Sequence, residues 1–178
     1  MRYLSDPKVP DYPDPSRSPP AADPHPSDPA TTVDDPGAVL FVCTMNAIRS
    51  PMAAGLLRHL AGHRVYVASA GVRAGEPDGF VSAVMDELGI DLADHQPQSL
   101  DELADTSFDL VITLSPEAHH QALELTRTMA VDVEYWPSLD PSMADGTRDV
   151  RLAQYREARD TLLARIKSRF AIAGSPNV

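Results

Sequence analysis

Four short apolar runs alternate with helical patterns along most of this chain, and this alternation limits what the chain can fold into. The first run, residues 38–42, is continuous and rich in branched and aromatic side chains, as is typical of a strand buried in a parallel sheet. The other apolar runs cover residues 65–68, 110–114 and 131–136. The helix signals are starts at Ser50-Pro51 and Pro77-Asp78, a helix from Pro116 to Leu125, and a long helix from Leu152 to Phe170. This order predicts a small doubly wound α/β domain with a four-stranded parallel sheet flanked by helices.

The junction between the first predicted strand and the first predicted helix has Cys43 and Arg49 at its two ends. Ser50 is a good N-cap and Pro51 a good first helical residue, so we expect the helix to begin there. The backbone N–H groups of this loop and of the helix start can surround a phosphate-sized anion. The same surroundings favour the thiolate form of a cysteine.

This arrangement suggests covalent chemistry on a tetrahedral oxyanion. Cys43 would be the nucleophile, and the two-pronged guanidinium of Arg49 would bind two oxygens and stabilise their charge in the transition state. The alternative is that Cys43 is a small buried hydrophobe and Arg49 a solvated surface charge. The strand, loop, cap and proline in sequence favour the first interpretation.

The loop segment and several later motifs resemble those of one known family. The segment from Cys43 to Ser50, with Pro51-Met52-Ala53 after it, resembles the Cys-x5-Arg-Ser/Thr phosphate loop of the low-molecular-weight protein tyrosine phosphatases and the related thioredoxin-coupled arsenate reductases. Further family motifs are matched in order by Ser69-Ala70-Gly71, Pro77-Asp78, residues 108–112 and Asp140-Pro141. The resemblance covers roughly residues 38–170 and implies the four-stranded fold predicted above.

The resemblance also implies a mechanism. Cys43 would form a phosphocysteine, while Asp140 would protonate the departing oxygen and then help water attack the intermediate. An independent argument is that Asp140 follows the run 131–136, at the sheet edge where open parallel sheets bind ligands. A turn aspartate before a proline is the alternative. No metal and no cofactor is needed for this chemistry.

Other loop residues take their expected roles from the resemblance. The phosphate-binding set is Thr44, Met45, Asn46, Ala47, Ile48, Arg49 and Ser50. Within it, Asn46 would brace the loop backbone and Ser50 would donate a hydrogen bond to the Cys43 sulfur. His95 looks like the histidine that bonds to this asparagine, and a partly exposed loop histidine is the alternative.

Four departures from the family pattern bear on the substrate. Met45 stands where typical members have glycine, and Ile48 where they have a second cysteine. Ser142 and Met143 follow Asp140-Pro141 in place of the tyrosines that flank a phosphotyrosine ring. The chain has one cysteine, so the internal disulfide relay of the arsenate-reductase branch is impossible.

The leading hypothesis is therefore hydrolysis of a phosphomonoester, with protein phosphotyrosine favoured. A single-cysteine arsenate reductase that uses an external small thiol is the second hypothesis. A catalytically weak module that binds phosphorylated proteins is the third, and an intact Asp140 argues against it. The expected partner is a phosphorylated protein or a small phosphomonoester.

Charge and composition exclude several other classes. The net charge of −11, with no basic stripe, argues against nucleic acid as a partner. No apolar run approaches the length of a membrane span, and a lone cysteine suits a reducing cytoplasm. The histidine pairs His59 with His63 and His119-His120 lack convincing metal-ligand spacing, so we expect no metal site.

The composition changes once along the chain. Residues 1–36 hold most of the 17 prolines, interleaved with aspartates and serines, and are predicted to be a disordered Pro-rich tail. The phosphatase-like domain is expected over residues 37–172, with a short C-terminal tail over residues 173–178. The N-terminal tail carries no residue with an expected role in catalysis.

Overall fold

The computed structural model describes residues 36–104 and 107–170. The two predicted tails lie outside these residues, except for Pro36. Within them the chain forms an α/β domain whose elements follow the predicted order of strands and helices. None of the described helices is both long enough and apolar enough to span a membrane.

A four-stranded parallel sheet forms the centre of the domain, as predicted. Its strands are β1 Ala38–Cys43, β2 Tyr66–Gly71, β3 Leu110–Thr113 and β4 Asp132–Tyr135. Their order in the sheet is β2-β1-β3-β4, so β1 is an inner strand that pairs with β2 on one side and β3 on the other. The sheet order reverses at β1, and this places Cys43, its last residue, at the point where open parallel sheets bind ligands.

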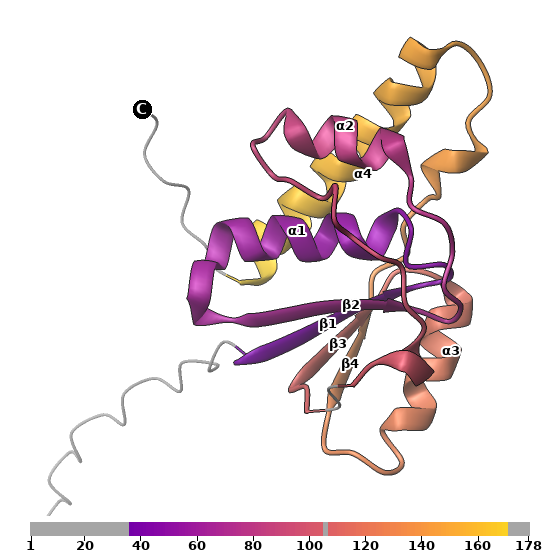
Figure 1. Cartoon of the computed structure of the whole chain (residues 1–178). Helices are drawn as coiled ribbons and strands as arrows, with labels where there is room; N and C mark the ends of the chain where they lie inside the picture. Colours follow the sequence, from indigo (N-terminus) through magenta and orange to yellow (C-terminus); the bar gives the residue numbers. More distant parts are fainter. Residues whose placement is uncertain (1–35, 105–106, 171–178) are drawn as a thin grey trace, which may run out of the picture. The chain divides into compact units, whose positions relative to one another are not determined.

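Helices cover both faces of the sheet (Figure 1). On one face lie α1 Arg49–Ala61, α2 Gly79–Asp86 and α4 Arg148–Arg169, and on the other lies α3 Pro116–Leu125. Successive residues of β1 point to opposite faces, so Val39 and Phe41 pack in the larger core with α1, α2 and α4. Leu40 and Val42 pack in the smaller core that includes Ala118 and Ala122 of α3.

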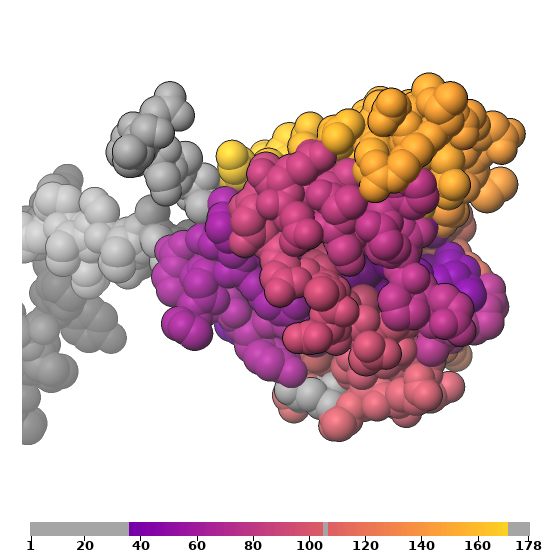
Figure 2. Space-filling model, turned by 45° about the horizontal axis from the view of Figure 1, so that its top comes forward, coloured from indigo at the N-terminus to yellow at the C-terminus, as the bar shows by residue number. Residues whose placement is uncertain are grey.

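An ion-pair network joins α2 to α4, which adjoin one another in the space-filling view (Figure 2). Glu87, the C-cap residue of α2, accepts hydrogen bonds from Arg156 and Arg159 of α4 at 2.7 to 3.1 Å. The Arg159 side chain is buried and also donates to the Val84 carbonyl at 2.7 Å. These contacts fix the rotation of α4 against the core.

Several element boundaries differ from the sequence prediction. Helix α1 begins at Arg49, and its N-cap residue is Ile48, which makes no side-chain cap bond. The prediction of Ser50 as the N-cap is therefore wrong, because Ser50 lies inside the first turn and its hydroxyl is used elsewhere. Asp78 does cap α2 as the Pro77-Asp78 start predicts, and α4 begins at Arg148, with Thr147 as its N-cap, before the predicted Leu152. The sequence did not predict three short 3₁₀ segments, Gly62–Arg64, Leu100–Glu102 and Pro141–Met143.

Candidate active site

Asn46 organises the loop between β1 and α1. It is fully buried and has a φ of 51°, in the left-handed region that asparagine tolerates better than most residues. Its side chain donates to Ser50 Oγ at 2.9 Å and accepts from the Gln98 backbone N–H at 3.0 Å. Its backbone carbonyl lies 2.8 Å from His95 Nε2, which therefore donates. The loop is thus held by two residues that are distant in the sequence.

Cys43 lies at the bottom of this loop and is 2 % exposed. Its Sγ accepts a hydrogen bond from the Asn46 backbone N–H at 3.3 Å and lies 2.9 Å from Ser50 Oγ. Both groups can donate to a sulfur that carries negative charge. Two hydrogen-bond donors are therefore within reach of the Cys43 sulfur, the atom that would react in covalent chemistry.

Arg49 is buried at the other end of the loop and reaches toward the segment after β4. Its Nη1 donates to the carbonyls of Leu114 and Ser138 at 3.3 and 3.0 Å, and its Nη2 forms an ion pair with Asp140 at 3.2 Å. Its Nε is buried and has no hydrogen-bond partner among the residues that the structure describes. A buried donor without a partner is costly, so this nitrogen remains able to bind an acceptor if the side chain shifts.

Asp140 stands at the start of the 3₁₀ segment Pro141–Met143. One carboxylate oxygen accepts from the backbone N–H and hydroxyl of Ser142, at 3.0 and 2.7 Å, and the other faces Arg49. The side chain is 34 % exposed, so it is oriented by the protein yet within reach of a ligand at the mouth. This position suits a group that transfers a proton to or from a bound substrate.

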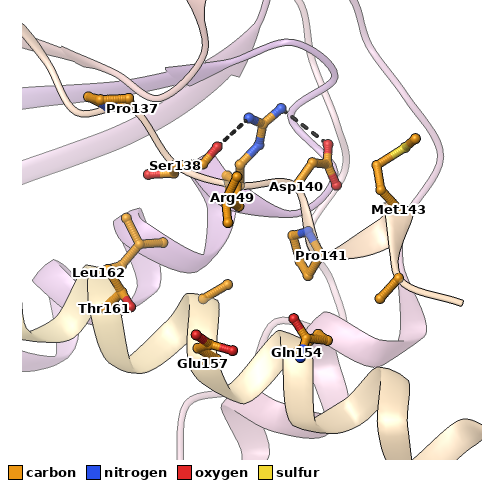
Figure 3. Close-up of a pocket in the computed structure, with 13 residues that line it drawn as sticks. Arg49, Pro137, Ser138, Asp140, Pro141, Met143, Gln154, Glu157, Thr161 and Leu162 are labelled. Carbon is orange, nitrogen blue, oxygen red and sulfur yellow. Dashed lines mark hydrogen bonds and ion pairs between the residues drawn. The ribbon is translucent and has the colours of Figure 1, made fainter.

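Two cavities meet at Arg49 and Asp140. The smaller, about 200 Å³, is the candidate catalytic mouth and is lined by Cys43, Met45, Ala47, Ile48, Arg49, Gly75, Glu76, Asp140 and Ser142. The larger, about 490 Å³, lies between residues 137–144 and α4 (Figure 3). Figure 3 shows Arg49 held between Ser138 and Asp140, above Glu157 and Gln154 of α4. The segment that carries Asp140 therefore borders both cavities.

The structure places the predicted residues Met45, Ala47, Ile48, Arg49 and Asp140 in one cavity lining with Cys43. Asn46 and Ser50 contact the sulfur, while His95 is not in that lining and bonds to the Asn46 carbonyl. Thr44 turns away to donate to Ser115 Oγ at 3.0 Å. The sequence did not indicate Gln98, Ser138 or Glu76 as parts of the site. Gln98 and Ser138 act through backbone groups, for which no side-chain pattern gives a signal. Among the residues described, no group of three or more potential metal ligands comes together.

Comparison with known proteins places this geometry in context. Residues 38–169 match the model of the family described as low molecular weight phosphotyrosine protein phosphatase. An arsenate reductase from Shouchella clausii is 34 % identical over 136 residues, which are 76 % of this chain and 96 % of that protein. A low molecular weight protein tyrosine phosphatase from T. tengcongensis is 26 % identical with a TM-score of 0.63, covering 75 % of this chain and 97 % of the other. An arsenate reductase from Archaeoglobus fulgidus is 27 % identical with a TM-score of 0.59, covering 75 % and 98 %.

Proposed function

Because this chain belongs to the low molecular weight phosphotyrosine protein phosphatase family, we propose that it hydrolyses phosphomonoesters through a phosphocysteine on Cys43. The observation that carries the proposal is the position of Arg49. This residue starts the helix after the loop of Cys43 and forms an ion pair with Asp140, and one of its buried nitrogens has no partner within residues 36–104 and 107–170. Nucleophile, anion-binding group and acid thus share one small cavity.

The first chemical step transfers the phosphoryl group to the enzyme. The Cys43 thiolate attacks phosphorus as the bond to the leaving oxygen breaks, and protonated Asp140 gives that oxygen its proton. Arg49 and the loop N–H groups stabilise the charge on the equatorial oxygens. In the second step, water attacks phosphorus and gives a proton to the Asp140 carboxylate. Phosphate then leaves, and the Cys43 thiolate re-forms with Ser50 as its hydrogen-bond donor.

The finer proposal, that the substrate is a protein phosphotyrosine, comes from the family. No aromatic side chain is among the described residues that line the catalytic mouth, where Met45 and Ser142 lie instead. Met143 nearby is 82 % exposed, so it could cover one face of a ring without stacking. Aryl phosphates fit this apolar rim, and phosphotyrosine is the proposed aryl substrate in proteins.

Arsenate reduction with an external thiol is the second candidate. The curated relatives support it more directly than they support phosphotyrosine hydrolysis, because several that are 32 to 35 % identical are arsenate reductases. Here the Cys43 thiolate would attack arsenate to form a sulfur–arsenic(V) adduct, as one As–O bond breaks and its oxygen leaves as water after protonation. A small thiol would attack the Cys43 sulfur, the electron pair of the broken bond would reduce arsenic to arsenite, and a second thiol would free Cys43 as a disulfide forms. The chain's single cysteine is the reason to rank hydrolysis first.

One set of assays separates these functions. Purified protein should hydrolyse 4-nitrophenyl phosphate and a phosphotyrosyl peptide, with EDTA making no difference. Cys43→Ser should lose turnover yet bind vanadate, since the loop donors and Arg49 remain. Arsenate should inhibit as a phosphate mimic, with no arsenite formed with thioredoxin and little with glutathione and glutaredoxin. Efficient arsenite release with the small thiol, together with poor turnover of every phosphomonoester, would make the second candidate the function.

A further inference from the structure

Among the described residues that line the catalytic mouth, one carboxylate has no part in the proposed mechanism. Of the charged residues lining it, Arg49 and Asp140 are paired with each other, and the second Asp140 oxygen is held by Ser142. Glu76 lines the same cavity, is exposed, and has no hydrogen bond or ion pair within the described part of the chain. Its charge is therefore available to a molecule that enters the mouth.

The backbone before Glu76 is fixed against the phosphate loop. Arg73 N donates to the Thr44 carbonyl at 2.9 Å, and Gly75 N donates to the Met45 carbonyl at 2.8 Å. A Cβ at Gly75 would lie 3.0 Å from Met45, closer than nearly all real contacts of this kind. This segment therefore packs directly on the loop that binds the anion.

The backbone after Glu76 is fixed as well. One oxygen of Asp78 caps α2 through the Phe80 and Val81 N–H groups, and the other accepts from the hydroxyl of Tyr155 at 2.9 Å. Tyr155 is fully buried in α4. Glu76 thus stands between two anchored points, and its place at the rim follows from the fold.

Within the described part of the chain, the rim offers no free cation to neutralise this carboxylate. Arg73, the nearest basic residue in the sequence, forms two hydrogen bonds with Glu117, at 2.8 and 3.3 Å. The interior of the mouth attracts the phosphoryl group, while the rim presents a negative charge to whatever the phosphoryl group is attached to. We propose that Glu76 makes the enzyme prefer phosphomonoesters whose leaving group carries a positive charge over those whose leaving group is anionic. This inference rests on the proposed hydrolase function.

Three aryl phosphates of matched leaving-group chemistry test the proposal. The leaving group of phosphotyramine is positively charged, and that of 4-ethylphenyl phosphate is uncharged. The leaving group of 3-(4-phosphooxyphenyl)propanoate is negatively charged. At roughly 7 Å in a water-like medium, one unit of charge on the substrate changes kcat/KM by about threefold. The cationic and anionic substrates differ by two units of charge, so their kcat/KM values should differ by about five- to tenfold. High salt should reduce this ratio, because mobile ions screen an exposed charge.

Variants at residue 76 assign the effect. Glu76→Gln should bring the ratio close to one, and Glu76→Lys should invert it, with both ratios normalised to the same variant's turnover of the neutral substrate. Glu124→Gln removes an exposed carboxylate on α3 and should keep the wild-type ratio. A wild-type ratio of one, or a ratio that does not respond to charge at residue 76, would overturn the proposal.

Binding separates this inference from the proposed function. Dissociation constants of the three compounds for Cys43→Ser, and for Cys43→Ser with Glu76→Gln, should show the same order without any turnover. If wild-type protein hydrolyses none of the three, the hydrolase proposal fails, and the binding series still decides whether Glu76 selects charge. Equal affinities in that series would rule the selection out.

Discussion

Ser50 Oγ lies 2.9 Å from Cys43 Sγ and 3.2 Å from the Ala70 carbonyl, and it has one proton to offer to these two acceptors. Asn46 Nδ2 donates to the same oxygen at 2.9 Å and keeps it in place. With a neutral thiol, Ser50 can donate to Ala70 and accept from sulfur. A thiolate can only accept, so Ser50 would then donate its proton to the sulfur and no longer to Ala70. We therefore expect the direction of the Ser50 O–H bond to depend on the charge of Cys43.

Ser50→Ala should therefore slow the enzyme at both steps that involve a sulfur anion. Hydrogen bonds to charged groups are worth about 1.5–3 kcal/mol, so we expect turnover to fall roughly 10- to 100-fold. Alkylation of Cys43 by iodoacetamide at pH 7 should slow as well. Ser50→Thr keeps the hydroxyl and is the control. Unchanged alkylation in Ser50→Ala would show that the contact does not stabilise the thiolate.

Asp140→Asn tests the general acid. We expect a loss of roughly 10²–10⁴-fold with phenyl phosphate, whose leaving group needs a proton, and a smaller loss with 4-nitrophenyl phosphate. The measurement is kcat with both substrates across the pH range. Equal losses with both substrates would mean that Asp140 acts only by holding Arg49.

Gly71→Ala should distort the phosphate loop, although glycine has no side chain that could contribute to the site. A Cβ there would lie 2.3 Å from the Arg73 carbonyl oxygen and 2.7 Å from the Asn46 nitrogen, so the phosphate loop would have to move. We expect a lower Tm and loss of most activity. Gly79→Ala is the matched control, because a Cβ at Gly79 meets nothing within 4 Å. Similar losses in both variants would contradict the crowding argument.

Acid should weaken the contact between α2 and α4. Hydrogen bonds from Arg156 and then Arg159 lower the pKa of Glu87 from 4.5 to about 2. A lowered pKa in the folded protein stabilises it above pH 4.5, and this contribution is lost as the pH falls toward 2. The Glu87 side chain is 37 % exposed, so solvent screening keeps the effect modest.

Thermal unfolding between pH 5 and pH 2 measures this contribution. Wild-type Tm should fall more steeply than that of Glu87→Gln, and Glu124→Gln should follow the wild type. Parallel curves for wild type and Glu87→Gln would show that the network does not couple protonation to stability.

The parts of the site that are close in the sequence could be predicted from it. Cys43 and Arg49 lie at the two ends of one short loop, so they are close in space whatever the rest of the chain does. The strand and helix signals on either side of the loop are therefore enough to predict that they lie together. Asp140 came from the family motif and its place after a strand. The N-cap preference of serine misplaces Ser50, because that preference describes only local geometry. The buried contacts with Cys43 and Ala70 decide where the Ser50 hydroxyl points.

Glu76 and Gln98 could not be placed from the sequence, for a related reason. Both lie in segments without periodic structure, and their positions depend on anchors elsewhere in the chain. The Gly75–Met45 and Asp78–Tyr155 contacts place Glu76, while the Gln98 backbone is placed by Asn46. Local preferences do not report such contacts between distant segments.

The tethers of the phosphate loop also make its shape depend on residues that are translated much later. The loop at Asn46 and Arg49 is translated early, but its hydrogen bonds and ion pair go to Gln98, Ser138 and Asp140. A growing chain that ends after β2 holds Cys43 without the groups that shape its loop in the folded domain. We therefore expect the loop to take its final shape only after Asp140 has left the ribosome.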